Sequence, residues 1–209
     1  NIFETYNMSL TFSLYCVANI FILPFLRLYT KGVSDVQYVD HLLPYLFIMT
    51  YLLSNGRSAA QRVIEYAGHF KLTQNRSIIE SAINICVSLV CVFKFGIYGV
   101  LFGTIAALFY RTNDMILYSS HKLLKRSAKN TYFKWLLNFI LFAVIMFVSN
   151  KLFDITMLNS YIMIIIYAAI TGVVVVAAFF VMGSVIDKES YLYCRDFIVR
   201  KIKLKFDRQ

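Results

Sequence analysis

The chain has 209 residues, of which 59% are hydrophobic and 15% are charged, and its formal net charge is +10. Soluble domains contain about 45–50% apolar and about 25% charged residues, so this composition excludes an ordinary soluble domain and favours an integral membrane protein. With 8 Gly and 2 Pro, the chain also fits neither a disordered, a collagen-like nor an all-β protein.

Six apolar segments follow one another along the chain. About 20 helical residues cross the hydrocarbon core of a bilayer. The predicted spans are residues 8–28, 38–67, 77–94, 95–118, 133–152 and 157–186, followed by a basic tail at 187–209. We therefore predict an all-α fold, a polytopic transmembrane bundle of about six helices. Because the first residue is Asn1 and not Met, we also expect a fragment or a processed product.

The second and third predicted spans carry polar side chains in different ways. In the second span, residues 42–53 are apolar, and polar residues follow as far as Gly68. In the third span, polar residues recur at steps of three and four, which places them on one face of a helix and does not fit a strand. These residues are Ser77, Glu80, Ser81, Asn84 and Ser88.

The fourth predicted span begins with a stripe of small residues. Gly96, Gly99, Gly103 and Ala107 recur at steps of three and four. Such a stripe lets two helix backbones approach closely in lipid. The last span is uncharged from residue 155 to 186 and is longer than one bilayer requires, an excess that helix tilt can absorb.

Basic residues alternate between the predicted loops. The net charge is +3 over residues 57–76, +5 over 121–134 and +3 over 187–209, whereas the intervening loops lie between −1 and +1. Lys and Arg are enriched in cytoplasmic loops, so both termini are predicted to be cytoplasmic. The net charge is then explained by topology and by contact with anionic lipids. A nucleic-acid partner is not predicted, because the aromatic residues lie mostly within the spans.

Charged residues within the predicted spans are the candidates for a substrate cavity. A charge at mid-membrane costs about 2.5–3.5 kcal/mol and persists when it is paired or faces water. The candidate residues are Arg57, Arg62, Glu65, Glu80, Asn84, Arg111 and Asp114. They indicate a hydrated, net-cationic cavity for an anionic substrate. The alternative is that the charges lie at the cytoplasmic interface, where long side chains reach water, and that Asn84 only packs.

Within these spans, two charged pairs are three residues apart, Arg62 with Glu65 and Arg111 with Asp114. This spacing lets each pair interact on its own helix. The chain contains no P-loop, dinucleotide fingerprint or nucleophile elbow, and its His and Cys residues do not have metal-ligand spacing. We therefore predict no metal and no cofactor, and these motifs do not indicate an enzyme; the prediction of a membrane transporter comes from the family resemblance of the following stretches.

Four stretches resemble one protein family. They are PFLRLYTKGVSDVQY (24–38), RVIEYAGHFKLTQNRSIIESAINI (62–85), FGIYGVLFGTIAALFYR (95–111) and HKLLKRSAKNTYFKWL (121–136). Over about residues 15–140 the chain resembles the C-terminal half of bacterial polysaccharide flippases. These are the O-antigen and capsule repeat-unit exporters of the multidrug/oligosaccharidyl-lipid/polysaccharide exporter superfamily.

The resemblance implies one lobe of a two-lobed, MATE-like fold around a central cavity, with about half of the full protein missing from this chain. It implies transport of undecaprenyl-pyrophosphate-linked oligosaccharides across the bacterial cytoplasmic membrane for polysaccharide biosynthesis. The implied partners are this substrate, membrane lipids and other polysaccharide-assembly proteins. The cationic lumen of the family matches Arg57, Arg62 and Arg111 here.

Two further hypotheses stay open from the sequence. The first is a sister branch of the superfamily, a cation-coupled multidrug exporter or a peptidoglycan-precursor flippase. A drug exporter is expected to have an acidic, aromatic cavity, for which Glu80 is the main support. The second is a membrane polysaccharide polymerase or acyltransferase, which needs a long outward loop with catalytic residues, whereas the outward loops predicted here are short.

The alternating charge predicts the topology, which reporter fusions can test. A reporter fused after Lys129 should be read on the cytoplasmic side, and one fused after Asp35 should be read outside. The physical reason is the retention of Lys- and Arg-rich loops in the cytoplasm. The opposite result at both positions would overturn the orientation.

Overall fold

The computed structural model describes residues 1–33, 40–152 and 158–206, and the regular elements of these residues are all helical. The elements are α1 (Ile2–Tyr29), α2 (Leu42–Gly56), α3 (Ser58–Tyr66), α4 (Phe70–Phe95), α5 (Ile97–Tyr118), the π-helical turn η1 (Ser119–Leu123), α6 (Lys129–Leu152), α7 (Tyr161–Ile186) and α8 (Lys188–Phe206). The predicted all-α class is confirmed.

Four helices of the described part are long and apolar enough to cross a membrane: Ile2–Tyr29, Phe70–Phe95, Lys129–Lys151 and Tyr161–Ile186. These helices fit a membrane protein. Helix α2 has 15 residues, which corresponds to about 22 Å and is shorter than a bilayer core of about 30 Å. The apolar run of α5 ends at Arg111. The predicted number of about six spans therefore stays a prediction.

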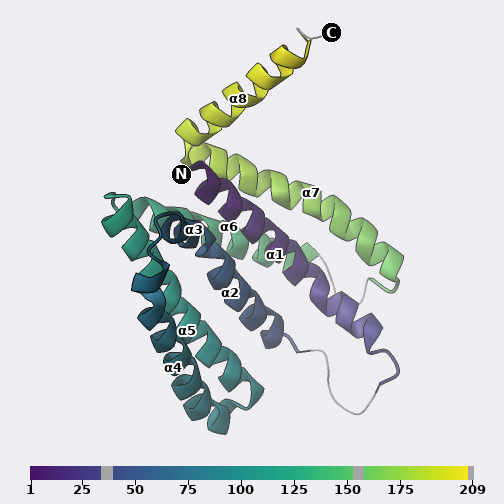
Figure 1. Cartoon of the computed structure of the whole chain (residues 1–209). Coiled ribbons are helices and arrows are strands. Elements are labelled where there is room, and N and C mark those ends of the chain that lie inside the picture. The colour runs from purple at the N-terminus through teal and green to yellow at the C-terminus, as the bar shows by residue number, and fades with distance from the viewer. Residues whose placement is uncertain (34–39, 153–157, 207–209) are drawn as a thin grey trace.

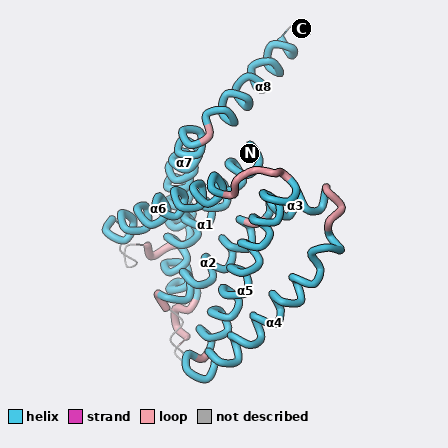
Figure 2. The backbone as a smooth tube through the Cα atoms, turned by 90° about the vertical axis from the view of Figure 1, so that its left-hand side faces the viewer, coloured by secondary structure: helices cyan, strands magenta, loops and turns pink. Residues whose placement is uncertain are grey.

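The helices are arranged around α1, as Figure 1 shows. Helices α6 and α7 pack against α1 on one side, and α2 packs against it on the other. Helix α5 packs on α2, and α4 forms an antiparallel hairpin with α5 at the edge of the bundle. Helix α8 leaves the end of α7 near the N-terminus and projects away from the bundle (Figures 1 and 2).

Phe12 of α1 lies at the centre of the apolar core. Its ring is 1% exposed and contacts Trp135 and Phe139 edge to face, at centroid distances of 5.6 and 5.1 Å. Phe179 of α7 packs on the same ring at 6.3 Å. Aromatic rings bury large areas and prefer such geometries. These four rings therefore stabilise the packing of α6 and α7 on α1.

The small-residue stripe of α5 packs against α4. A Cβ atom placed on Gly99 would lie 2.4 Å from the backbone of Cys91, and one placed on Gly103 would lie 2.7 Å from the backbone nitrogen of Ser88. Gly96 connects the two helices with φ of +55°, a conformation that glycine adopts without strain. The predicted close approach at the stripe is thus confirmed for Gly99 and Gly103.

The second predicted span differs from the structure. In place of one helix over residues 38–67, the chain forms α2 and α3 with a break at Arg57, and the predicted start at residue 38 lies outside the described residues. Gly56 lies directly against the ring of Trp135, where a Cβ atom would be 2.0 Å from the indole. Glycine has low helix propensity, and the missing side chain at Gly56, beside the break, makes room for Trp135 of α6.

The other helix boundaries differ at their ends. Helices α1, α4 and α6 begin at Ile2, Phe70 and Lys129, ahead of the predicted 8, 77 and 133. The apolar runs predicted the lipid-facing parts, whereas the helices extend into polar residues that hydrogen-bond or reach water. Helix α7 begins at Tyr161, and the predicted start at 157 lies outside the described residues. The tail predicted at 187–209 forms α8 as far as Phe206.

Replacing Gly103 with Val should destabilise the α4–α5 hairpin. The added atoms would overlap the side chain and backbone of Ser88, and overpacking of this kind costs about 1–3 kcal/mol. Unfolding in detergent measures the effect. Gly172→Val on α7 is the matched control, because a Cβ atom there has no neighbour within 4 Å. Equal stability of the two variants would contradict the close packing.

Candidate functional site

The break between α2 and α3 brings Arg57 toward α4. Its Nη1 donates a hydrogen bond to Oε1 of Glu80 at 2.9 Å. The side chains of Arg57 and Glu80 are 18% and 21% exposed. Arg57, predicted in the second span, therefore forms an ion pair with Glu80, predicted in the third span. This ion pair is partly shielded from solvent.

Arg111 of α5 lies at the centre of the same group, with its side chain 4% exposed. Its Nη1 donates to Oδ2 of Asp114 at 3.0 Å, and its Nη2 donates to Oγ of Ser77 at 3.1 Å. Its Nε lies 3.6 Å from Oε2 of Glu80 and has no hydrogen-bond partner among the described residues. The predicted pair of Arg111 and Asp114 is confirmed.

Arg76 of α4 completes the group by donating from Nη1 to Oδ1 of Asp114. We call Arg57, Arg76, Arg111, Glu80 and Asp114 the charge cluster. It contains three guanidinium groups and two carboxylates joined by ion pairs. Arginine stays protonated in proteins. With both carboxylates ionised, the charge cluster has a net charge of +1.

Two members of the charge cluster lie well inside their helices, whereas Arg57 lies at the junction of α2 and α3. Glu80 is ten residues from the start of α4 at Phe70, and Arg111 is seven residues from the end of α5 at Tyr118. At 1.5 Å per residue, these separations are about 15 and about 10 Å. Burial makes an unpaired charge costly, and the ion pairs with Asp114 and Glu80 offset that cost for Arg111, whose side chain is 4% exposed.

Two of the predicted site residues lie apart from the charge cluster. Arg62 and Glu65 are exposed on α3. The guanidinium of Arg62 lies 4.3 Å from the centre of the Phe3 ring, and Glu65 accepts a hydrogen bond from Gln61 at 2.8 Å. The ion pair expected between Arg62 and Glu65 does not form in the described structure. Arg62 contacts Phe3 instead, and Glu65 binds Gln61.

Asn84 lies one turn beyond Glu80 on α4 and faces the packing interface. Its Oδ1 accepts a hydrogen bond from Oγ of Ser88 at 3.1 Å, and its backbone carbonyl lies 2.9 Å from the place where a Cβ of Gly103 would be. These contacts favour the packing alternative for Asn84 over a contact with substrate.

Sequence reasoning missed Arg76 and Ser77 as members of the site. Arg76 was assigned to a basic loop, whereas α4 begins before it and turns it toward α5. Its partner Asp114 is 38 residues away, so no helical spacing could have indicated the contact. Ser77 was recognised on the polar face of the third span, but its bond to Arg111 depends on the pairing of α4 with α5.

A second polar group joins three helices near the termini. Nζ of Lys134 on α6 lies 2.9 Å from Oδ2 of Asp187, and it donates to Oγ1 of Thr5 on α1 at 2.7 Å. Asp187 also accepts from the backbone nitrogen of Ser190 at 3.1 Å, which caps the first turn of α8. We call Thr5, Lys134, Asp187 and Ser190 the terminal tie. It connects α1, α6 and the α7–α8 junction.

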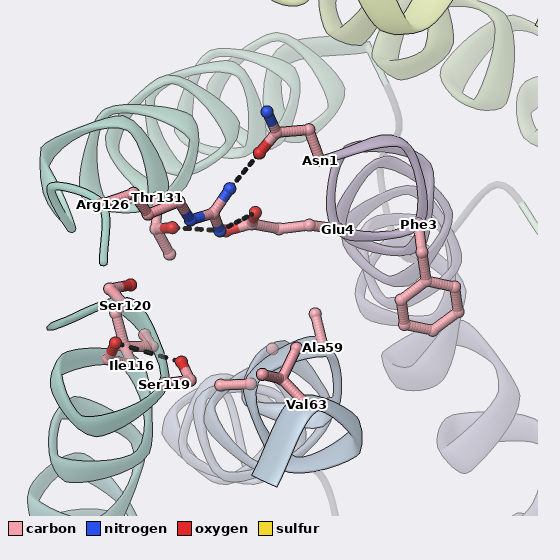
Figure 3. A pocket seen from close by; sticks show the side chains of 12 residues that line it. Asn1, Phe3, Glu4, Ala59, Val63, Ile116, Ser119, Ser120, Arg126 and Thr131 are labelled. Atoms are coloured by element: carbon pink, nitrogen blue, oxygen red, sulfur yellow. Dashed lines mark hydrogen bonds and ion pairs between the residues drawn. The ribbon is translucent and has the colours of Figure 1, made fainter. Parts of the chain in front are cut away.

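A cavity of about 100 Å³ lies beside the terminal tie, between α1, α3 and η1. Figure 3 shows Arg126 directed at Asn1 and Glu4 across one wall of this cavity. Nη2 of Arg126 donates to Glu4 at 2.8 Å, and Thr131 donates to the other oxygen of that carboxylate. The two charged side chains of the wall neutralise each other, although the buried Nε of Arg126 has no hydrogen-bond partner among the described residues.

Metal-ligating side chains do not gather in the described part of this site. Within residues 1–33, 40–152 and 158–206, no three His, Cys, Asp or Glu side chains are close enough to hold a metal ion. Both carboxylates of the charge cluster are occupied by guanidinium groups. The chemistry that the cluster offers is recognition of an anion, because guanidinium groups form charge-assisted hydrogen bonds with phosphate and carboxylate oxygens.

Asp187 should make the stability of the bundle depend on pH. Burial by itself raises the pKa of its carboxyl group, but hydrogen bonds from Lys134, Ser190 and Thr5 outweigh burial and hold that pKa well below its usual range. A carboxyl group of this kind contributes stability above its unfolded pKa of about 3.9, and the contribution is lost as the pH falls toward the folded-state pKa.

Asp187→Asn is therefore expected to lower the free energy of unfolding by about 3 kcal/mol at pH 7, because Lys134 would stay buried without a countercharge. The difference from wild type should shrink as the pH falls below about 4. Unfolding in detergent across a pH series measures both effects. Asp196→Asn, in an exposed pair with Arg195, is the control; a difference that is independent of pH would contradict the role of the Asp187 charge.

No protein-family model, curated protein or solved structure matches this chain.

Proposed function

We propose that this chain is a lobe of a membrane flippase that moves undecaprenyl-pyrophosphate-linked oligosaccharide repeat units across the bacterial cytoplasmic membrane for surface polysaccharide biosynthesis. The observation that carries the proposal is the charge cluster. It places three arginines against two carboxylates within a bundle of apolar helices. The sequence resemblance to O-antigen and capsule repeat-unit exporters supports the same function.

The chemistry of the charge cluster suits a pyrophosphate group. Planar guanidinium groups match phosphate oxygens with paired hydrogen bonds and keep their charge in a partly buried site. Arg57 and Arg111 come from different helices and face the same carboxylate. A ligand between them would contact both sides of the site, and electrostatic attraction is stronger there than in bulk water.

The break at Arg57 also suits a transporter. Substrate sites of secondary transporters often contain discontinuous helices near the middle of the membrane. Here the first arginine of the cluster lies at the junction of α2 and α3. The proposed architecture is one lobe of about six spans in a two-lobed, MATE-like fold, with both termini of the chain in the cytoplasm. Alternating access would then move this lobe against a second one.

The charge cluster is less suited to a cation-coupled multidrug exporter. Such a protein needs a carboxylate that is free to bind a cation or a proton, whereas Glu80 and Asp114 each pair with arginines. A peptidoglycan-precursor flippase would use the same pyrophosphate chemistry. The sugar attached to the lipid distinguishes it from the proposed function, and the charge cluster recognises only the anionic part.

Arg57→Ala should reduce surface polysaccharide about tenfold in the native cell, since a charge-assisted hydrogen bond contributes about 1.5–3 kcal/mol. Quantifying the surface polysaccharide, with an immunoblot of the membrane fraction, measures the effect. Arg62→Ala is the matched control because Arg62 lies on α3 but outside the charge cluster. Normal polysaccharide at normal protein level in the Arg57 variant would refute the cavity role.

A further inference from the structure

The position of Glu80 resembles that of a bound anion. Its Oε1 accepts a hydrogen bond from Arg57 at 2.9 Å, and its Oε2 faces Nε of Arg111 at 3.6 Å. The carboxylate thus lies between two guanidinium groups from different helices. We infer that Glu80 is a built-in competitor, which holds the anion position of the charge cluster until a lipid-linked pyrophosphate displaces it; this inference rests on the proposed function.

The contacts of Glu80 leave binding capacity unused. The 3.6 Å separation from Arg111 is too long for a normal hydrogen bond, and the buried Nε of Arg111 has no hydrogen-bond partner among the described residues. A buried donor without a partner destabilises the site. A phosphate group has more acceptor oxygens than a carboxylate, so it can satisfy Arg57 and Arg111 together.

Asp114 has a different role in the same cluster. It binds Nη1 of Arg111 at 3.0 Å on the same helix and also pairs with Arg76. Ser77 binds Nη2 of Arg111 at 3.1 Å. These bonds orient the guanidinium of Arg111 from the side opposite Nε. Asp114 and Ser77 are therefore positioning residues, and Glu80 is the group that a ligand can replace.

The place of Glu80 in the fold permits its displacement. Helix α4 lies at the edge of the bundle (Figure 2), and among the described residues it contributes none to the buried apolar core. The Glu80 side chain is 21% exposed. Its carboxylate can rotate away from the arginines into a more hydrated position without disrupting the core contacts of α1.

Competition by Glu80 would set both selectivity and release. A singly charged anion gains little by exchanging with a carboxylate that is already in place, whereas a pyrophosphate brings more charge and more acceptors. After displacement, the nearby carboxylate repels the bound anion. Transport requires a site that binds its substrate and also lets it leave, and this repulsion favours departure.

The test measures binding of radiolabelled inorganic pyrophosphate and of farnesyl pyrophosphate to the full chain in detergent micelles. Glu80→Gln should bind both ligands about tenfold more tightly than wild type, since one neighbouring charge typically shifts a charged equilibrium by one pKa unit or more. Farnesol, which has no charge, should show no change. Glu65→Gln is the matched control, because it removes one negative charge from α3 outside the charge cluster.

The possible results separate the inference from the proposed function. Wild-type binding of pyrophosphate with equal or weaker binding by Glu80→Gln would overturn the competitor role and leave the proposed function standing. No preference for farnesyl pyrophosphate over farnesol in either protein would overturn both. If Glu80→Gln does not fold, Glu80→Asp replaces it. The shorter aspartate side chain cannot reach both arginines. The Glu80→Asp variant should therefore bind pyrophosphate more tightly than wild type, and equal binding would refute the inference.

Discussion

The charge of Arg111 is the constraint on which this part of the bundle depends. Its guanidinium cannot be deprotonated in a protein, and its side chain is almost completely buried. It therefore has to be surrounded by acceptors, which come from Asp114 on its own helix and from Ser77 and Glu80 on α4. This requirement determines how far α4 can slide along α5. The ion pairs of Arg111 therefore contribute to the registry of the hairpin.

The glycine stripe fixes the same two helices at their other end. Gly99 and Gly103 bring the backbone of α5 against that of α4 close to the turn at Gly96. The charge cluster joins these helices two to three turns further along. A close steric contact and an ion-pair network therefore act on one interface at separate points. Although α4 contributes no residue to the described apolar core, it is held by both.

The sequence predicted what depends on spacing along one helix. The apolar runs gave the helical class, the polar face of the third span contained Ser77 and Glu80, and the three-residue spacing of Arg111 and Asp114 gave a true ion pair. Contacts between helices were not accessible in this way. Glu80 is 23 residues from Arg57, and Gly56, beside the break, lies against Trp135 of the distant helix α6. Periodicity carries no information about such pairings.

The charge cluster and the terminal tie differ in how completely their charges are paired. In the terminal tie, Lys134 and Asp187 form a one-to-one pair, and Asp187 also accepts bonds from Thr5 and Ser190. Such a group gains nothing by binding a ligand. The charge cluster has unequal numbers of acids and bases and one long arginine–glutamate contact. An unneutralised charge that is partly shielded from solvent costs free energy, and under the proposed function an anionic ligand would offset this cost in the charge cluster.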